Sequence, residues 1–324
     1  MRLPLSDSGS NAGCICRSRG VSLIELVVVI TISGIIATVL GAIIVRPIQG
    51  YEAQVRRAQL VDAAEMAVRR LGRDIRQALP NSVRVRDALG NTNSVSCAAA
   101  AAVCTIEMLN TLDGARYRDG PGNIAHNHGP TQYRLRFNGA DTDGFNIVGF
   151  FRNITVPFTS TTQRLAIYNQ GVTLADAYAD ANSDLTAPRV ITNPTYTTFS
   201  INDDDGAPPD EHQVVPLTGS FRFRYASPNQ RIFVVDTPVS YVCSAGANGN
   251  ITRYWSYPIT AAQQSTPAGA TTALLSTPVT ACNISYSPGT NQRAGLVTLD
   301  ITVADAASGE QVRLLYQVHV DNSP

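Results

Sequence analysis

The sequence predicts an α+β protein in which one long amino-terminal helix, able to span a membrane over its first half, packs on a large antiparallel β-rich head. An apolar run covers residues 21–45, where Glu25 is the only charged residue, and helical spacing of apolar residues continues to Leu79. From Val83 onward, short alternating segments are separated by Gly, Pro, Asn and Asp, which is typical of antiparallel strands.

The apolar run is long enough to cross a bilayer, because a transmembrane helix needs about 20 apolar residues. A cleaved secretory signal fits less well, since its apolar part would be about 7–15 residues long and end in a small-residue cleavage site. Arg17 and Arg19 precede the run, and basic flanks stay on the cytoplasmic side. We therefore expect the rest of the chain on the far side of the inner membrane.

Glu25 is the unusual residue of this run. A carboxylate in hydrocarbon costs several kcal/mol, so it either reaches back to the interface or is paired and functional. A cut after Gly20 would make Val21 a new amino terminus four residues before Glu25. The carboxylate of one subunit could then neutralise the α-amine of a neighbouring subunit, in a stack where neither charge tolerates burial alone.

The segment GVSLIEL at residues 20–26, with its basic leader and apolar continuation, resembles the processing site of type IV prepilins and of type II secretion pseudopilins. The resemblance implies a pilin-like fold and cleavage after Gly20. It also implies N-methylation of Val21 by a prepilin peptidase/methyltransferase and a role for Glu25 in assembly. Val21 departs from the family pattern, which usually has Phe or Met there.

Residues 69–85 and 316–324 are similar to the MshO family, the minor pilins of the mannose-sensitive haemagglutinin (MSHA) pilus. This resemblance implies a subunit held in the inner membrane with its head in the periplasm, and then carried to the cell surface in the pilus. Its partners would be other major and minor pilins, the peptidase and the pilus assembly platform. A J-type pseudopilin of type II secretion, and an adhesin or DNA-uptake pilin, are the alternatives.

Composition and motifs argue against two other classes of function. The formal net charge is zero, so we expect no nucleic-acid partner. The chain lacks a G-x-S-x-G elbow, a phosphate loop and an H-E-x-x-H pair, so we predict no catalytic residue and a protein that is not an enzyme.

Beyond the apolar run, Pro47 is expected to kink the helix and Pro80 to end it. A helix from Val21 to Leu79 would be about 90 Å long at 1.5 Å per residue. The Arg and acidic residues of its second half, Asp74 among them, are predicted to form a solvated face or i,i+4 pairs. The opposite face carries the apolar residues Leu60, Ala64, Val68, Leu71, Ile75 and Leu79.

These elements divide the chain into three parts. Residues 1–20 are the predicted leader, residues 21–79 the long helix, and residues 80–324 a β-rich head of one or two lobes. Within the helix, residues 21–45 form the expected transmembrane and filament-core part, and residues 46–79 the amphipathic part.

Within the head, strands are predicted at residues 132–137 and 220–225, where alternation is clear over 133–137 and 221–225. Strands are also expected at residues 231–238 and 240–243. Residues 260–280 are expected to be a loop. The chain is predicted to close with a hairpin of residues 296–304 and 311–320.

Four cysteines lie outside the leader, namely Cys97, Cys104, Cys243 and Cys282. An even number in an exported chain suggests disulfides, and we expect Cys97–Cys104 and Cys243–Cys282, although three pairings are possible. A zinc site is the rival interpretation, but it lacks paired C-x-x-C spacing.

An acidic run gives the chain its one cofactor hypothesis. Asp203, Asp205 and Asp210 offer hard oxygen ligands that calcium prefers. An EF-hand does not fit, because placing Gly206 at the required glycine puts Ile201 at the first ligand position. A solvated turn accounts for the same residues.

Overall fold

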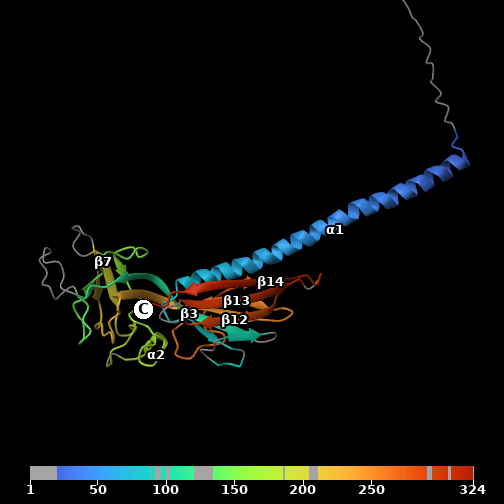
Figure 1. The fold of residues 1–324 in the computed structure, drawn as a ribbon. Helices are drawn as coiled ribbons and strands as arrows, with labels where there is room; N and C mark the ends of the chain where they lie inside the picture. The colour runs from blue at the N-terminus through green and yellow to red at the C-terminus, as the bar shows by residue number, and fades with distance from the viewer. Residues whose placement is uncertain are drawn as a thin grey trace, which may run out of the picture. The chain divides into compact units, whose positions relative to one another are not determined.

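The computed structural model describes residues 20–323 except 88, 92–95, 100–102, 120–133, 185–186, 204–210, 290–293 and 306–307. The chain divides into two compact units, Met1–Val55 and Arg56–Pro324. The first unit holds the amino-terminal part of helix α1, and the second holds the rest of α1 together with the whole β-rich head (Figure 1).

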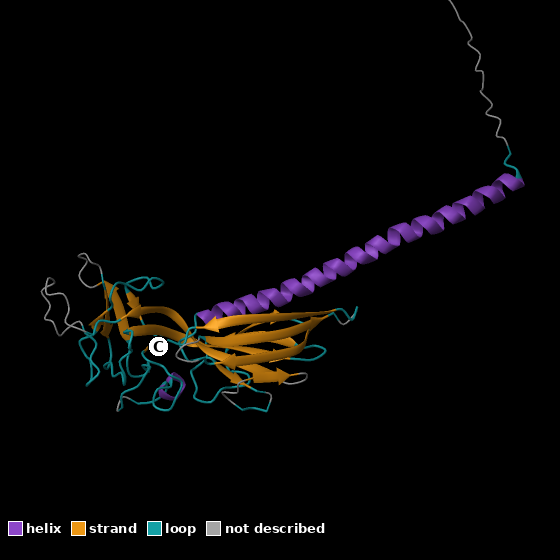
Figure 2. Cartoon of the chain, in the orientation of Figure 1, coloured by secondary structure: helices purple, strands orange, loops and turns teal. Residues whose placement is uncertain are grey.

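Helix α1 spans Leu23–Arg76, a length of 54 residues, and continues through Pro47 (Figure 2). It ends at Arg76 instead of the expected Leu79. The reason is a competing strand, because Ala78 forms an antiparallel bridge with Asn110 and the Leu79 N–H donates to a strand carbonyl at 2.8 Å. The last residues of the predicted helix are therefore paired with the head.

The described strands form three antiparallel sheets. The six-stranded sheet has the order β1-β3-β9-β10-β11, and β6 also pairs with β9. Its strands are β1 (Arg84–Arg86), β3 (Val103–Arg116), β6 (Arg164–Ala166), β9 (Arg231–Ser244), β10 (Asn250–Trp255) and β11 (Thr271–Ser276).

The second sheet has the order β14-β13-β12-β2 and the third has the order β4-β8-β7-β5. The strands of the second are β2 (Ser96–Ala99), β12 (Val279–Ser287), β13 (Gly295–Ala304) and β14 (Gln311–Val320). Those of the third are β4 (Phe145–Asn146), β5 (Phe158–Thr159), β7 (Phe199–Asp203) and β8 (His212–Pro216). A short helix, α2 (Ala177–Asp180), lies between β6 and β7 in the chain.

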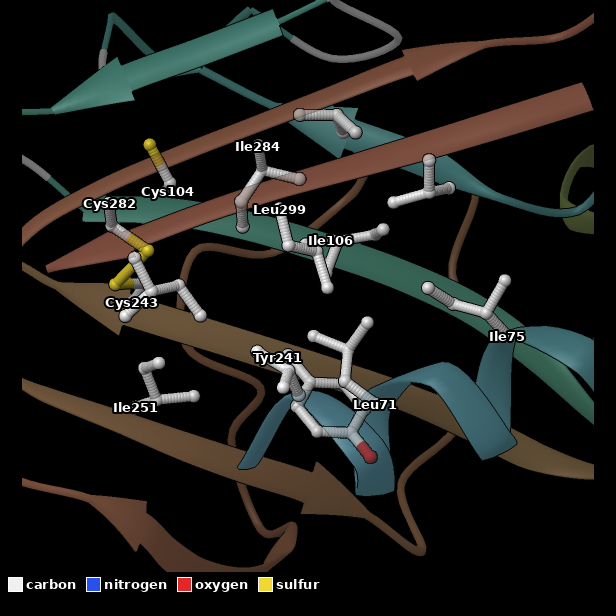
Figure 3. Close-up of a cluster of buried hydrophobic side chains, with 14 of the residues drawn as sticks. Leu71, Ile75, Cys104, Ile106, Tyr241, Cys243, Ile251, Cys282, Ile284 and Leu299 are labelled. Carbon is white, nitrogen blue, oxygen red and sulfur yellow. A yellow bond between two sulfur atoms is a disulfide. The ribbon is translucent and has the colours of Figure 1, made fainter. Parts of the chain in front are cut away.

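The main core lies where the end of α1 meets the six-stranded and second sheets. Leu71 and Ile75 of α1 point toward side chains such as Ile106, Tyr241 and Leu299 (Figure 3). A second core gathers around the third sheet and is rich in phenylalanine, and a smaller third core surrounds α2. The α+β fold class with an antiparallel head is therefore confirmed.

One glycine allows α1 to approach the second sheet closely. A Cβ placed on Gly72 would lie 2.8 Å from Cε1 of Tyr316 and 3.3 Å from Cγ2 of Val318, and both residues belong to β14. Real Cβ atoms are essentially never found closer than 3.0 Å to another heavy atom. The absence of a side chain at this position therefore sets the spacing between helix and strand.

Several head strands differ from those expected. Residues 231–244 form one strand, because Pro238 faces Leu109 next to a register shift in β3, where a proline is tolerated. The expected strand 220–225 is reduced to isolated bridges at Phe221 and Phe223. The alternation in this segment reflects the burial of one of its faces. Burial of one face does not by itself produce continuous hydrogen-bonded pairing with a neighbouring strand.

Two further segments complete the comparison. The expected loop 260–280 contains β11, which pairs with β10 over residues that no local pattern marks as a strand. Residues 132 and 133 of the expected strand 132–137 lie outside the described residues, and residues 134–137 form no strand. The terminal hairpin is present as β13 and β14, which pair over their whole length.

Candidate functional site

The expected processing junction lies just before α1. Gly20 and Val21 precede the helix and are exposed, and Val21 keeps 67% of its surface accessible. The first helical hydrogen bond in this region runs from the Leu26 N–H to the Ser22 carbonyl, at 3.1 Å. Gly20 and Val21 thus precede the first hydrogen-bonded turn of the described helix.

The first part of α1 carries its apolar side chains in the open. It is the one helix among the described residues that is long and apolar enough to cross a membrane, and none of its apolar window is buried. The hydroxyl groups of Thr31 and Thr38 donate to the carbonyls of Val28 and Ile35 at 2.9 and 2.8 Å. Their polarity is therefore satisfied inside the helix, as an apolar environment requires.

Glu25 lies in the first turn of α1. A carboxylate is favoured there because the helix amino terminus carries a partial positive charge. Ser22 and Glu25 also have the spacing of a capping box, in which the third helical residue returns to the N-cap backbone. Glu25 thus has a possible intrahelical role in addition to the proposed pairing with a neighbour's amine, and substitutions can separate the two.

The four cysteines of the head form two buried disulfides. Cys97 is joined to Cys104 and Cys243 to Cys282, with Cα–Cα distances of 5.7 and 6.5 Å. This is the pairing expected from the sequence, and Figure 3 shows the second bond within the main core. The bonds cross-link strands of the head.

Asp74 is buried and fastens α1 to the six-stranded sheet. Its side chain, 3% exposed, accepts hydrogen bonds from the Tyr241 hydroxyl and from Nε of Arg253, both at 2.7 Å. Arg70 of the same helix lies 3.4 Å away. Burial and the nearby Asp74 carboxylate raise the pKa of Tyr241, so its hydroxyl remains a donor. The expected i,i+4 pairing is therefore present at Arg70 and Asp74, but the expectation of a solvated face was wrong for Asp74, which is buried.

A second buried ion pair lies at the start of the head. Nε of Arg84 donates to Glu107 at 2.7 Å, and the Tyr257 hydroxyl donates to the same carboxylate at 2.9 Å. The guanidinium also lies 3.5 Å from the ring centroid of Tyr178. Burial raises the pKa of Glu107, although the charge of Arg84 opposes this shift.

The calcium hypothesis has little support from the described residues. Oδ1 of Asp203 lies 3.6 Å from Nε2 of His212, and its side chain is 60% exposed. Asp205 and Asp210 lie outside the described residues. Among the residues that the structure does describe, no group of three His, Cys, Asp or Glu could hold a metal ion.

A pocket of about 290 Å³ opens near the start of the head and is lined by Arg84, Tyr178 and Tyr286, among others. Two of its polar side chains already have hydrogen-bond partners within the protein. The Tyr178 hydroxyl donates to the Ser82 carbonyl at 2.9 Å, and Tyr286 accepts from the Asn322 amide at 3.0 Å. These bonds link α2 to the segment before β1, and the carboxyl-terminal segment to β12.

Sequence reasoning missed Asp74, Arg84, Glu107 and Arg253 as members of buried networks. A signal was available for Asp74, because it lies three residues after Leu71 and next to Ile75, on the apolar stripe of the helix. For the others, partners 23 and 179 residues apart in the chain left no local signal.

The comparisons with known proteins bear on the amino-terminal part alone. Searches of curated proteins and of solved structures found no match. Residues 15–41 match the family model described as the prokaryotic N-terminal methylation motif, and this range contains Gly20, Val21 and Glu25. The match supports the assignment of this chain to the type IV prepilin-like class.

Proposed function

We propose that the chain is a minor pilin of a type IV pilus of the MSHA type, which enters or primes the filament through its amino-terminal helix. One observation carries the proposal. The first part of α1 is apolar, exposed and free of charge except at Glu25, four residues after the residue that cleavage would expose as the new terminus. Outside the bilayer, covering this helix with the helices of sibling subunits removes its apolar side chains from water, which is favourable.

The terminal amine of Val21 and the carboxylate of Glu25 would set the register between neighbouring subunits. Val21 and Glu25 are separated by about 6 Å along a helix, at 1.5 Å per residue. A sibling helix displaced by about this distance brings its terminal amine beside the carboxylate of the first. Because each charge is costly alone in an apolar stack, this register is favoured over its neighbours.

The size of the head favours a rare subunit. Residues 56–324 form one compact unit with three buried cores, which would crowd every position if it were the repeating subunit. The patches 69–85 and 316–324 favour the MshO family within the class. The role proposed is structural, with the head in the periplasm before assembly and on the pilus surface afterwards.

Mass spectrometry of the amino terminus of the protein from its own cells tests the proposal. We expect a chain that begins at methylated Val21 and that is present in sheared pili. A chain that retains residues 1–20 and stays in the membrane would contradict it. A processed chain found only with the inner-membrane machinery of protein secretion would favour the J-type pseudopilin instead.

A further inference from the structure

A groove of about 570 Å³ runs between α1 and β14 within the second unit. Helix residues from Glu65 to Arg76 form one wall, and Leu314–Tyr316 of β14 form the other. Gly72 brings the two elements together, and Figure 1 shows the end of α1 lying along β14. The groove is therefore built into the packing of the helix on the sheet.

The groove follows the edge of β14 and not one of its faces. Three consecutive strand residues line it, and successive side chains of a strand point to opposite faces. β14 is the last strand of its sheet, and among the described strands it pairs with β13 alone. A ten-residue edge strand is usually protected, because its unpaired backbone groups can accept a further strand. Leu315 is nevertheless 66% exposed on this strand.

The helix wall is positively charged. Arg69 is paired with Glu65, whereas Arg73 and Arg76 are exposed and have no carboxylate within 4.0 Å among the described residues. The Arg76 guanidinium donates a hydrogen bond to the Tyr316 hydroxyl at 3.4 Å. Within the described part of the chain, the surface thus combines two arginines that have no carboxylate within 4.0 Å, an exposed leucine and a strand edge that no other described strand pairs.

We propose that this groove binds an extended acidic segment of a neighbouring pilin-like subunit, which adds to β14 as a further strand. Backbone hydrogen bonds supply affinity in this mode, and side-chain contacts supply specificity. Carboxylates of the segment face Arg73 and Arg76, and an apolar residue covers Leu315. The identity of the partner as a pilin-like subunit rests on the proposed function.

Two other occupants fit the same surface less well. A second copy of this chain placed symmetrically would bring like-charged arginines together, because a two-fold contact uses the same patch on both subunits. An anionic lipid headgroup would match the arginines, but it offers no backbone groups in register with the strand edge.

Site-specific crosslinking in piliated cells tests the proposal on the full chain. p-Benzoylphenylalanine replaces Leu315, and the crosslinked peptide is identified by mass spectrometry. We expect a peptide rich in Asp and Glu from another protein that carries an N-terminal methylation motif. The double variant R73E/R76E should lower the yield about tenfold, the factor that corresponds to 1.4 kcal/mol. The exposed Arg152 supplies the control R152E, which should leave the yield unchanged.

The same photoprobe at Leu274, which is 61% exposed on β11, controls for exposure alone. Crosslinks from Leu315 to lipid, to a second copy of the chain or to a peptide without carboxylates would overturn the proposal. The absence of any crosslink would also overturn it. So would a crosslinking yield that is the same in R73E/R76E as in the wild type, provided that the double variant keeps the wild-type unfolding midpoint. The state of Val21 is measured in the same samples. A processed chain in sheared pili with any of these outcomes refutes the groove and leaves the proposed function intact.

Discussion

Cys104 and Cys243 lie directly opposite each other on neighbouring strands β3 and β9, yet each is bonded to a cysteine of the other sheet. Cys97 belongs to β2 and Cys282 to β12, which are also neighbours. Both disulfides therefore cross from the six-stranded sheet to the second sheet at the same place. All four side chains are at most 2% exposed, so the bonds act as a buried staple between the sheets.

This arrangement predicts what happens when the staple is removed. In the double variant C97S/C282S, the remaining Cys104 and Cys243 face each other at a separation of about 4.5–5.5 Å between Cα atoms, which a disulfide can bridge. We expect a cross-strand bond to form and the free energy of unfolding to fall by about 2–5 kcal/mol. Peptide mapping without reduction and urea unfolding of the full chain in detergent measure the two effects.

The variant C97S/C104S is the matched control for this experiment, because it keeps one of the two links between the sheets. It should lose less stability than C97S/C282S. Two free thiols in C97S/C282S would show that the strand register places Cys104 and Cys243 too far apart.

A pair of substitutions at Glu25 separates its two possible roles. Glu25→Gln keeps the shape and hydrogen-bonding capacity of a capping box but removes the charge. If the carboxylate neutralises a sibling amine, Glu25→Gln and Glu25→Ala should both insert into the membrane and both be depleted from sheared pili. Immunoblots of membranes and of pili give the measurement. Normal incorporation of Glu25→Gln alone would assign the residue to helix capping, and normal incorporation of both would remove it from assembly.

The buried Asp74 is expected to contribute strongly to the stability of the head. In Asp74→Ala, the nearly buried Arg253 loses its carboxylate and Tyr241 loses its acceptor. Breaking a buried ion pair by removing one partner costs about 3–5 kcal/mol. Urea unfolding of the full chain in detergent, followed by the fluorescence of Trp255, measures this cost. Trp255 is the only tryptophan, and it lies 4.7 Å from the Arg253 guanidinium.

Asp62 provides the control on the same helix, because it is exposed. Asp62→Ala should change the free energy of unfolding by no more than about 0.5 kcal/mol. Equal effects of the two substitutions would mean that Asp74 does not hold α1 to the sheet.

The pH dependence of stability should reveal the burial of Glu107. Burial raises its pKa in the folded state above the ordinary value of 4.5. Between the two pKa values the folded chain binds more protons than the unfolded chain, so the contribution of Glu107 to stability falls as pH rises. The free energy of unfolding of the wild type, minus that of Glu107→Gln, should therefore decrease as the pH rises above the ordinary carboxyl pKa of 4.5. A difference that rises with pH would show that the Arg84 charge outweighs burial.

Several features of this protein follow from local sequence alone. The apolar run with Glu25, the segment GVSLIEL and the switch from helical to alternating spacing each lie within a short stretch of chain. The transmembrane-length helix, the methylation motif and the α+β class were predictable for that reason. Local periodicity is set by backbone geometry, which a short segment already possesses.

Only the tertiary structure decided which polar residues are buried and which edges are open. Asp74 lies on the apolar stripe of α1, but its partner Arg253 is 179 positions later in the chain, so only the fold shows the ion pair that compensates its burial. The union of two expected strands into β9, the strand character of β11 and the groove along β14 also depend on partners distant in sequence. Ion pairs and sheet edges are properties of neighbours in space, and the chain acquires those neighbours only when it packs.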